Sequence, residues 1–290
     1  MLTDSHVHLS FVKDKSAFLK STLASKIKPV FMGVDESSVN DLVNLCKSHN
    51  IAFFAGFHPL FLDKMCVSDR QGYIKAYLDR LFTLHNSVIK DMDFYNLCGL
   101  GEIGIDKRAS VSAQEQIAIC KAQLDVAFKY KKAVSLHVVK GHDLMLSLLS
   151  CLKAEHKLPV FCIHGATLSY DLLKAYSSYN AYFSFGSNLI KKKMTADTIS
   201  DVKDTVCVAN GNVKDNVKYL ISDKCQTMLK LISKDRIFIE SDYDGCSDIY
   251  PHAFLHNVYK SVAEILDLDE KSLERLVSDN LYNFIGAKSV

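Results

Sequence analysis

The sequence has no run of about eighteen apolar residues, so we expect no transmembrane helix. Its start lacks a basic region followed by an apolar core, and we therefore expect no secretory signal peptide. The nine cysteines are an odd number without CxxC spacing, which argues against a disulfide framework. This usage favours reduced thiols in the cytoplasm, or in the nucleus if the source is eukaryotic. The formal net charge is only +2, so charge alone neither requires nor excludes a polyanionic substrate.

Several common catalytic signatures are also missing from the sequence. No GxGxxG directly follows the first predicted strand, where a dinucleotide-binding fold would carry it, and the chain has no GxxxxGK[ST] phosphate-binding loop. It also has no GxSxG nucleophile elbow, which argues against a serine hydrolase. Internal repeats, low-complexity tails and domain-splitting linkers are absent, and 290 residues suffice for one large core. We therefore expect a single domain over residues 1–290.

Apolar, β-rich segments alternate with longer segments of helical periodicity along the chain. Strands are predicted at residues 2–8, 28–34, 51–57, 97–103, 133–137, 158–163, 180–185 and 236–240. Helical patterns occupy residues 36–49, 69–85, 112–131, 142–156, 169–178, 214–232, 251–266 and 271–284. Such alternation implies parallel strands covered by helices, and eight repeats in this length predict a (β/α)8 TIM barrel. An open, doubly wound sheet is the alternative architecture.

One stretch departs from this alternation. Residues 187–212 form a long connection after the seventh predicted strand, with weak periodicity and three successive lysines at 191–193. We interpret this stretch as a loop insertion, because long barrel loops commonly carry function. The lysine run itself is most simply a solvated surface.

Six predicted strands end on residues that can bind a metal ion. These residues are His6 and His8, His58, Glu102 and Asp106, His137, His164, and Asp242. Burial of an unpaired titratable group is costly, so its repeated placement at strand ends needs a function. The carboxyl ends of parallel barrel strands open onto one face, so these side chains should converge there. Imidazole favours zinc and carboxylate tolerates magnesium or manganese, and the set therefore predicts a metal site.

Other polar residues have simpler structural interpretations. Asp35 begins the segment DESS and is typical of a helix N-cap. His252 and His256 could share one face of a helix, but they lack the glutamate of an HExxH motif. Asp4 either hydrogen-bonds a ligand histidine without binding the metal itself, or only begins the first strand.

The segments DSHVHL, GFHP, GLGEIGID, SLH, CIH and ESD occur in this order over almost the whole chain. Together they resemble the TatD family of metal-dependent deoxyribonucleases, and GEIGID together with ESD is the most specific part. A segment with Gln116 and the AQL of residues 122–124 is also similar to that family. The resemblance implies a hydrolase with two divalent cations, which would be Zn²⁺, Mg²⁺ or Mn²⁺.

The resemblance also implies a role for each strand-end residue. The ligands would be His6, His8 and Asp242 on the first cation, His137 and His164 on the second, and Glu102 bridging both. Asp242 would also orient or deprotonate the attacking water. His58 would contact the scissile phosphate or protonate the leaving group, because imidazole titrates near neutrality. Its structural alternative is a buried histidine that bonds the backbone beside Pro59.

The sequence departs from the family pattern around these ligands. Residues 137–140 read HVVK where the family has His-x-Arg, and residues 164–167 read HGAT where it has His-Cys-Phe-Ser/Thr. Residues 240–244 read ESDYD in place of Glu-Thr-Asp-x-Pro. The ligands themselves are kept, so metal binding is better supported than substrate identity.

These observations predict a metal-dependent deoxyribonuclease that acts as a 3′–5′ exonuclease on single strands or 3′ ends. Lys107, Arg108 and Lys140 follow the fourth and fifth strands and could bind phosphates by charge. We expect a monomer with no membrane partner. The alternatives are a metal-dependent hydrolase of a small ester, lactone or phosphoester, and a catalytically weakened binding barrel.

Overall fold

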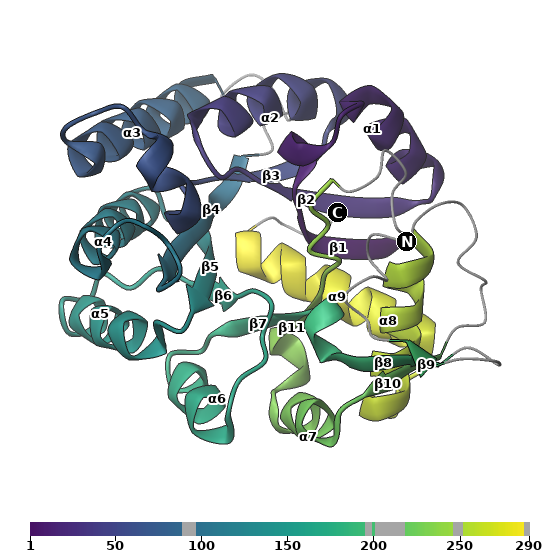
Figure 1. Ribbon diagram of the computed structural model, residues 1–290. Coiled ribbons are helices and arrows are strands. Elements are labelled where there is room, and N and C mark those ends of the chain that lie inside the picture. Colours follow the sequence, from purple (N-terminus) through teal and green to yellow (C-terminus); the bar gives the residue numbers. More distant parts are fainter. Residues whose placement is uncertain (89–96, 195–198, 201–217, 246–251, 287–290) are drawn as a thin grey trace. The chain divides into compact units, whose positions relative to one another are not determined.

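The computed structural model of the protein describes residues 1–88, 97–194, 199–200, 218–245 and 252–286. Eight strands form one sheet in the order β1-β2-β3-β4-β5-β6-β7-β11 (Figure 1). They are β1 (Leu2–Val7), β2 (Ile27–Met32), β3 (Ala52–Ala55), β4 (Leu97–Asp106), β5 (Ala133–Val139), β6 (Phe161–Ile163), β7 (Tyr182–Phe185) and β11 (Ile237–Ile239). A parallel bridge from Val7 of β1 to Tyr243, just beyond β11, joins the two ends of this order. The predicted (β/α)8 TIM barrel is therefore confirmed.

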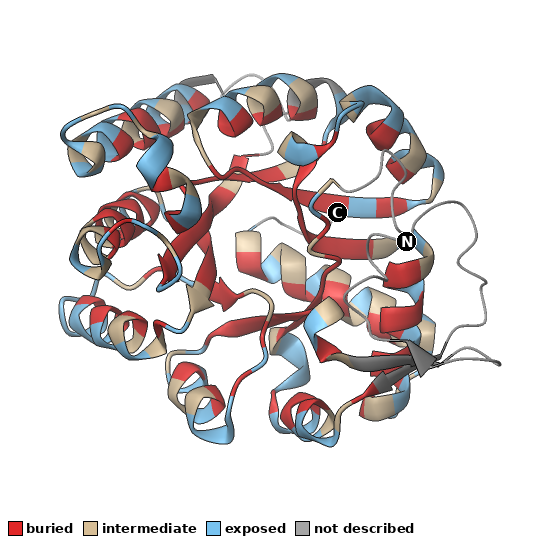
Figure 2. Cartoon of the chain, in the orientation of Figure 1, coloured by how far each residue is buried: buried red, intermediate tan, exposed pale blue. Residues whose placement is uncertain are grey.

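Helices alternate with these strands along the chain. They are α1 (Lys15–Ala24), α2 (Glu36–His49), α3 (Arg70–Val88), α4 (Ala113–Lys129), α5 (His142–Ala154), α6 (Tyr170–Ser177), α7 (Asp223–Leu231), α8 (His252–Leu266) and α9 (Glu270–Ile285). The barrel strands are almost wholly buried, whereas the helices carry buried and exposed stripes (Figure 2). This pattern is typical of parallel strands covered by amphipathic helices. No helix in the described ranges is both long and apolar enough to cross a membrane.

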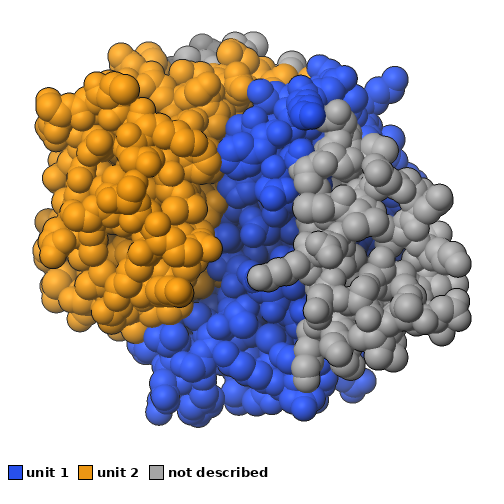
Figure 3. Space-filling view, viewed as in Figure 1, with its two compact units in different colours: residues 1–30, 164–283, 287–290 blue, residues 31–163, 284–286 orange. Residues whose placement is uncertain are grey.

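The chain divides into two compact units (Figure 3). The second unit, residues 31–163 and 284–286, contains β3 to β6 and α2 to α5. Its strands are parallel, and His137 of β5 pairs in register with Gly104 of β4. A Cβ atom on Gly104 would lie 1.9 Å from the carbonyl oxygen of His137, and its φ is +152°. Only glycine therefore lets these two strands approach so closely between Glu102 and Asp106.

The first unit, residues 1–30, 164–283 and 287–290, contains β1, β7 and β11. Two backbone hydrogen bonds hold the end of β1 beside the chain after β11: His8 N–H donates to Tyr243 O (2.9 Å) and Asp242 N–H donates to His6 O (3.1 Å). The buried Tyr259 of α8 donates its hydroxyl to Thr3 O (2.8 Å) and so fixes the start of β1. These bonds position the residues that follow both strands.

The structure corrects two sequence interpretations. The helix expected over 214–232 is α7 only at Asp223–Leu231, because Lys218–Ile221 forms strand β10. The insertion near 187–212 is not wholly loop. It contains a 3-10 turn at Ser187–Leu189 and the strands β8 (Ile190–Met194) and β9 (Ile199–Ser200), and β8 pairs antiparallel with β9 and β10. Residues 195–198 and 201–212 of the insertion lie outside the described residues.

Candidate metal centre

Glu102 lies at the centre of a buried cluster in the second unit. This residue of β4 is 1% exposed, and its Oε1 is 2.6 Å from His137 Nδ1 and 3.3 Å from His58 Nε2. Both histidines are buried as well. Three potential ligands from three successive strand ends thus meet within one unit. This is the convergence that the strand-end pattern predicts.

His58 is fixed by the turn that follows it. Its Nδ1 accepts the Leu60 N–H (3.1 Å), which caps the 3-10 helix Pro59–Lys64. An accepting Nδ1 leaves the proton of a neutral imidazole on Nε2, the atom that faces Glu102. The two sequence interpretations of His58 are therefore compatible, because one ring nitrogen bonds the backbone while the other is directed at the acidic cluster.

Asp106 is the second carboxylate in contact with His137. It is fully buried, and its Oδ2 lies 3.0 Å from His137 Nε2 and 2.6 Å from Arg108 Nη2. Burial alone would raise the pKa of Asp106, but the hydrogen bonds from His137 and Arg108 outweigh it and hold the pKa well below its usual range. The Asp106 carboxylate is therefore ionised at neutral pH.

A second cluster, in the first unit, has the dimensions of a cation site. His6 Nε2 and His8 Nε2 are 3.2 Å apart, and Asp242 Oδ1 lies 3.9 Å and 3.6 Å from them, respectively. The point in the plane of these three atoms that is equidistant from all of them lies roughly 2.1 Å from each, which is the length of Zn–N and Zn–O bonds. The residues present therefore fit a divalent cation.

Asp242 has an unusual backbone in this cluster. Its φ is 51°, in the left-handed region that few residues other than glycine, asparagine and aspartate occupy. Burial opposes ionisation of its side chain, but a hydrogen bond from His8 and the neighbouring His164 and His6 imidazoles lower the pKa of the carboxyl. Such a conformation at a carboxylate among histidines is typical of functional sites.

The family profile of TatD related DNases matches residues 3–286 of the chain. The chain belongs to this family.

Solved structures of the TatD family share its fold. YjjV, a TatD homolog from Escherichia coli K12, is 16% identical with a TM-score of 0.72, and the match covers 99% of this chain and 98% of that one. A TatD family hydrolase from Entamoeba histolytica is 13% identical with a TM-score of 0.68, covering 98% and 97%, respectively. The phosphotriesterase homology protein from Escherichia coli, solved with phosphate in its active site, is 13% identical with a TM-score of 0.50 and 98% coverage of both chains. No curated protein matches the chain.

The TatD assignment confirms the resemblance drawn from the sequence motifs and makes the chain a member of the metal-dependent hydrolase barrels. The two clusters differ in how they would accept a cation. The 2.6 Å between Glu102 Oε1 and His137 Nδ1 is a close contact between a carboxylate oxygen and a ring nitrogen. Two ligands of one tetrahedral zinc ion lie about 3.3 Å apart, so a shared ion would have to separate this pair. The His6–His8–Asp242 cluster fits a cation as it stands.

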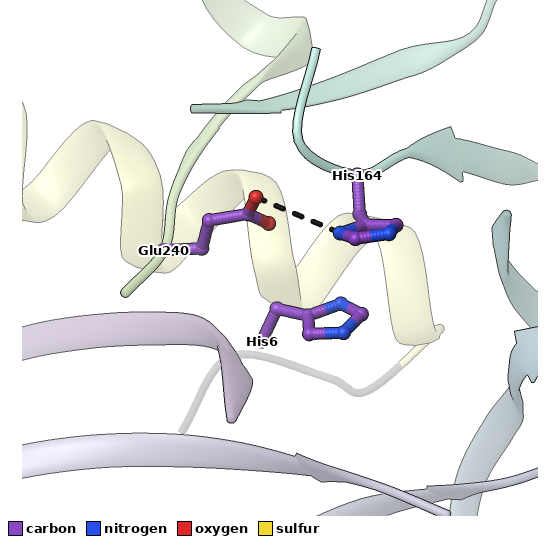
Figure 4. A group of neighbouring side chains, drawn as sticks. All are labelled: His6, His164 and Glu240. Atoms are coloured by element: carbon purple, nitrogen blue, oxygen red, sulfur yellow. Dashed lines mark ion pairs between the residues drawn. The ribbon is translucent and has the colours of Figure 1, made fainter. Parts of the chain in front are cut away.

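Glu240 is a site residue that the sequence interpretation missed. It lies beside His6 and His164, with its Oε1 3.7 Å from His164 Nδ1 (Figure 4). The same oxygen accepts the Gly165 N–H (2.7 Å), whereas the buried Oε2 has no hydrogen-bond partner among the described residues. A buried carboxylate oxygen in this position can bind a cation. The sequence contained a signal for Glu240, because Glu240 and Asp242 occupy alternate positions of one segment, as His6 and His8 do.

Asp4 supports the same region through the backbone. Its Oδ1 accepts the Ser241 N–H (2.8 Å) and the His6 N–H (3.3 Å), and the residue is fully buried. Asp4 therefore joins the HxH segment of β1 to the segment that carries Glu240 and Asp242. This is a positioning role, beyond that of a plain strand start.

Two of the three basic residues that were expected to bind phosphates form ion pairs with carboxylates. Lys107 Nζ is 3.1 Å from Asp143 Oδ1, and Arg108 binds the buried Asp106. Lys140 is exposed and has a left-handed backbone, with φ of 54°. Two of the three charges are thus paired with carboxylates within the second unit.

Two buried glutamines of α4, two helical turns apart, support the Glu102 cluster. Gln116 accepts the Asp106 N–H (2.9 Å) and donates to Asp106 O (3.1 Å). Gln123 accepts the Phe57 N–H (2.9 Å) and donates to Phe57 O (3.2 Å), just before His58. Each side-chain amide thus bonds both backbone groups of one residue in or beside the cluster. The periodicity predicted this helix, but only the resemblance drew attention to the segments that carry the two glutamines.

Gln123→Leu should destabilise the protein by about 2–4 kcal/mol, because it leaves the buried N–H and C=O of Phe57 without their partners. Urea unfolding measures the change. Gln114→Leu on the exposed side of α4 is the matched control and should stay within about 0.5 kcal/mol of wild type. Equal stability of the two variants would show that the Gln123 bonds do not hold the Phe57 segment.

Proposed function

We propose that this TatD family member hydrolyses phosphodiester bonds in DNA with two divalent cations, acting on single strands or 3′ ends as a 3′–5′ exonuclease. The observation that carries the proposal is the His6–His8–Asp242 cluster, whose three ligand atoms are spaced for one cation. Glu102 and His137, which lie together in the second unit, would contribute ligands to a second. The phosphate in the active site of the phosphotriesterase homology protein supports phosphoester chemistry on this fold.

Each side chain has a defined task in this reaction. In this proposal His6, His8 and Asp242 would hold the first cation, His137 and His164 would hold the second, and Glu102 would contribute to both. When bound, the cations lower the pKa of the attacking water and stabilise charge on the phosphoryl oxygens. Asp242 orients that water and accepts its proton. His58, with its proton on Nε2, donates to the phosphate or to the leaving oxygen.

We also propose where the substrate makes contact. Lys140, exposed at the end of β5, binds a phosphate by charge, and Lys107 and Arg108 do so in addition to their carboxylate contacts. The modest net charge of +2 suits an end or a short strand better than a long duplex. We propose that the enzyme acts as a monomer in the cytoplasm or nucleus.

The test is hydrolysis of 3′- and 5′-labelled single-stranded oligonucleotides by protein reloaded with Zn²⁺, Mg²⁺ or Mn²⁺. We expect stepwise loss of nucleotides from the 3′ end and loss of activity after EDTA treatment. Anomalous scattering at the metal edges of a crystal should show two ions. Cleavage that is unchanged by EDTA would contradict the proposal.

A small-substrate hydrolase is the second candidate. It is favoured by the ion pairs of Lys107 and Arg108, which leave fewer unpaired charges for a polyanion. Lactones and small phosphate esters, assayed beside the oligonucleotides, distinguish the two activities by their kcat/KM values. Tight metal binding without turnover of any of these compounds would indicate a binding barrel instead.

A further inference from the structure

Four charged or polar side chains of the second unit form one connected chain of hydrogen bonds and ion-pair contacts. Arg108 binds Asp106 with two nitrogens, Nε to Oδ1 (3.0 Å) and Nη2 to Oδ2 (2.6 Å). Asp106 Oδ2 lies 3.0 Å from His137 Nε2, and His137 Nδ1 lies 2.6 Å from Glu102 Oε1. The chain therefore runs from a half-exposed guanidinium to the buried carboxylate of Glu102.

His137 has a carboxylate at each ring nitrogen, which fixes its ring plane. The contacts disfavour a 180° flip of the ring, because a flipped ring would present carbon atoms to both acids. A cation held by Nδ1 would leave the other ring proton on Nε2, where Asp106 would accept it. A ligand histidine with a carboxylate at its other nitrogen is oriented and made more basic.

Hydrogen bonds to both its backbone and its side chain fix the position of Asp106. Its backbone bonds Gln116, its Oδ1 accepts the Arg108 N–H (2.8 Å), and the side chain is fully buried. A buried carboxylate is unfavourable unless its oxygens are bonded, and the bidentate guanidinium of Arg108 satisfies both of them. Without Arg108, the orientation of Asp106 would depend on His137 alone among these side-chain contacts.

We propose that Asp106 and Arg108 are positioning residues that keep a proton on His137 Nε2 and fix the ring, so that Nδ1 is directed at Glu102 and at the second cation. Arg108 thus acts on His137 through Asp106, and a phosphate contact is not its main role. The effect on cation binding rests on the proposed function. The orientation of the His137 ring in the metal-free protein is independent of that function.

The experiment compares Asp106→Asn, Arg108→Ala and Arg108→Lys with wild type. Long-range ¹H–¹⁵N spectra of histidine-labelled protein, assigned with His137→Gln, report which ring nitrogen carries the proton. Calorimetric titration of metal-free protein with Mn²⁺ reports both cation sites. Arg70→Ala is the matched control, since it removes another arginine–carboxylate pair of this unit, Arg70 with Glu115 (2.8 Å).

We expect Asp106→Asn and Arg108→Ala to change the ¹⁵N shifts of His137 and to weaken one Mn²⁺ site by about 10–100-fold. Arg108→Lys should restore part of the affinity, and Arg70→Ala should match wild type. If Arg108→Ala raises KM for the oligonucleotide but leaves the shifts and Mn²⁺ binding unchanged, Arg108 is a phosphate contact and the proposal is wrong. If the shifts change while wild type cleaves no DNA, the positioning holds and the proposed function fails.

Discussion

Glu102→Gln should lower kcat for DNA cleavage by about 10³-fold, equivalent to about 4 kcal/mol of transition-state stabilisation. Glutamine keeps the shape of the side chain and one oxygen that can accept from His137. It removes the negative charge and one ligand oxygen, so it cannot bind two cations as the carboxylate does. Steady-state kinetics in Mn²⁺, together with the metal content of the purified variant, measures the effect. We expect fewer than two ions per chain.

The stability of the metal-free Glu102→Gln variant distinguishes a loss of catalysis from a loss of folding. Glu102 is a buried acid, and a neutral amide is less costly to bury, so the metal-free Glu102→Gln protein should unfold at the same urea concentration or a higher one. Glu155→Gln, at an exposed end of α5, is the control and should keep full activity. Metal-dependent cleavage by Glu102→Gln at the wild-type rate would refute the bridging role.

The barrel was predictable because each strand is a short apolar run between longer helical segments. The errors occurred where this signal is weak. Helix α1 was not among the helices predicted, and it buries only Phe18, Leu19 and Thr22, which give little periodicity. The segment Lys218–Ile221 is a strand where a helix was expected, because four residues such as KYLI fit either periodicity.

The ligand candidates were predictable for a topological reason. Parallel strands bring their carboxyl ends together, so His58, Glu102 and His137 could be grouped without knowing any rotamer. The partners of these residues could not be predicted in the same way. Arg108 was interpreted as a phosphate contact, but its guanidinium binds Asp106, two residues earlier, and this depends on the turn after β4. Sequence spacing does not determine such side-chain directions.

Asp242→Asn should reduce kcat by about 10³-fold or more with little change in the stability of the metal-free protein. Asparagine is one of the few residues that tolerates the left-handed backbone of position 242, where φ is 51°. The variant should therefore keep the local fold, whereas Asp242→Ala would also strain the backbone. The neutral amide cannot accept a proton from water, and it is a weaker ligand for the cation between His6 and His8.

The control for Asp242→Asn is Asp244→Asn, the same substitution at an exposed position of the same segment. The two variants remove the same charge from the chain, so a general electrostatic effect on DNA binding should appear in both as a higher KM. Only Asp242→Asn should lower kcat and abolish one of the Mn²⁺ sites in calorimetry. If Asp242→Asn keeps more than about a tenth of wild-type kcat, the carboxylate neither activates the water nor anchors the first cation, and the assignment of this cluster as the catalytic cation site is wrong.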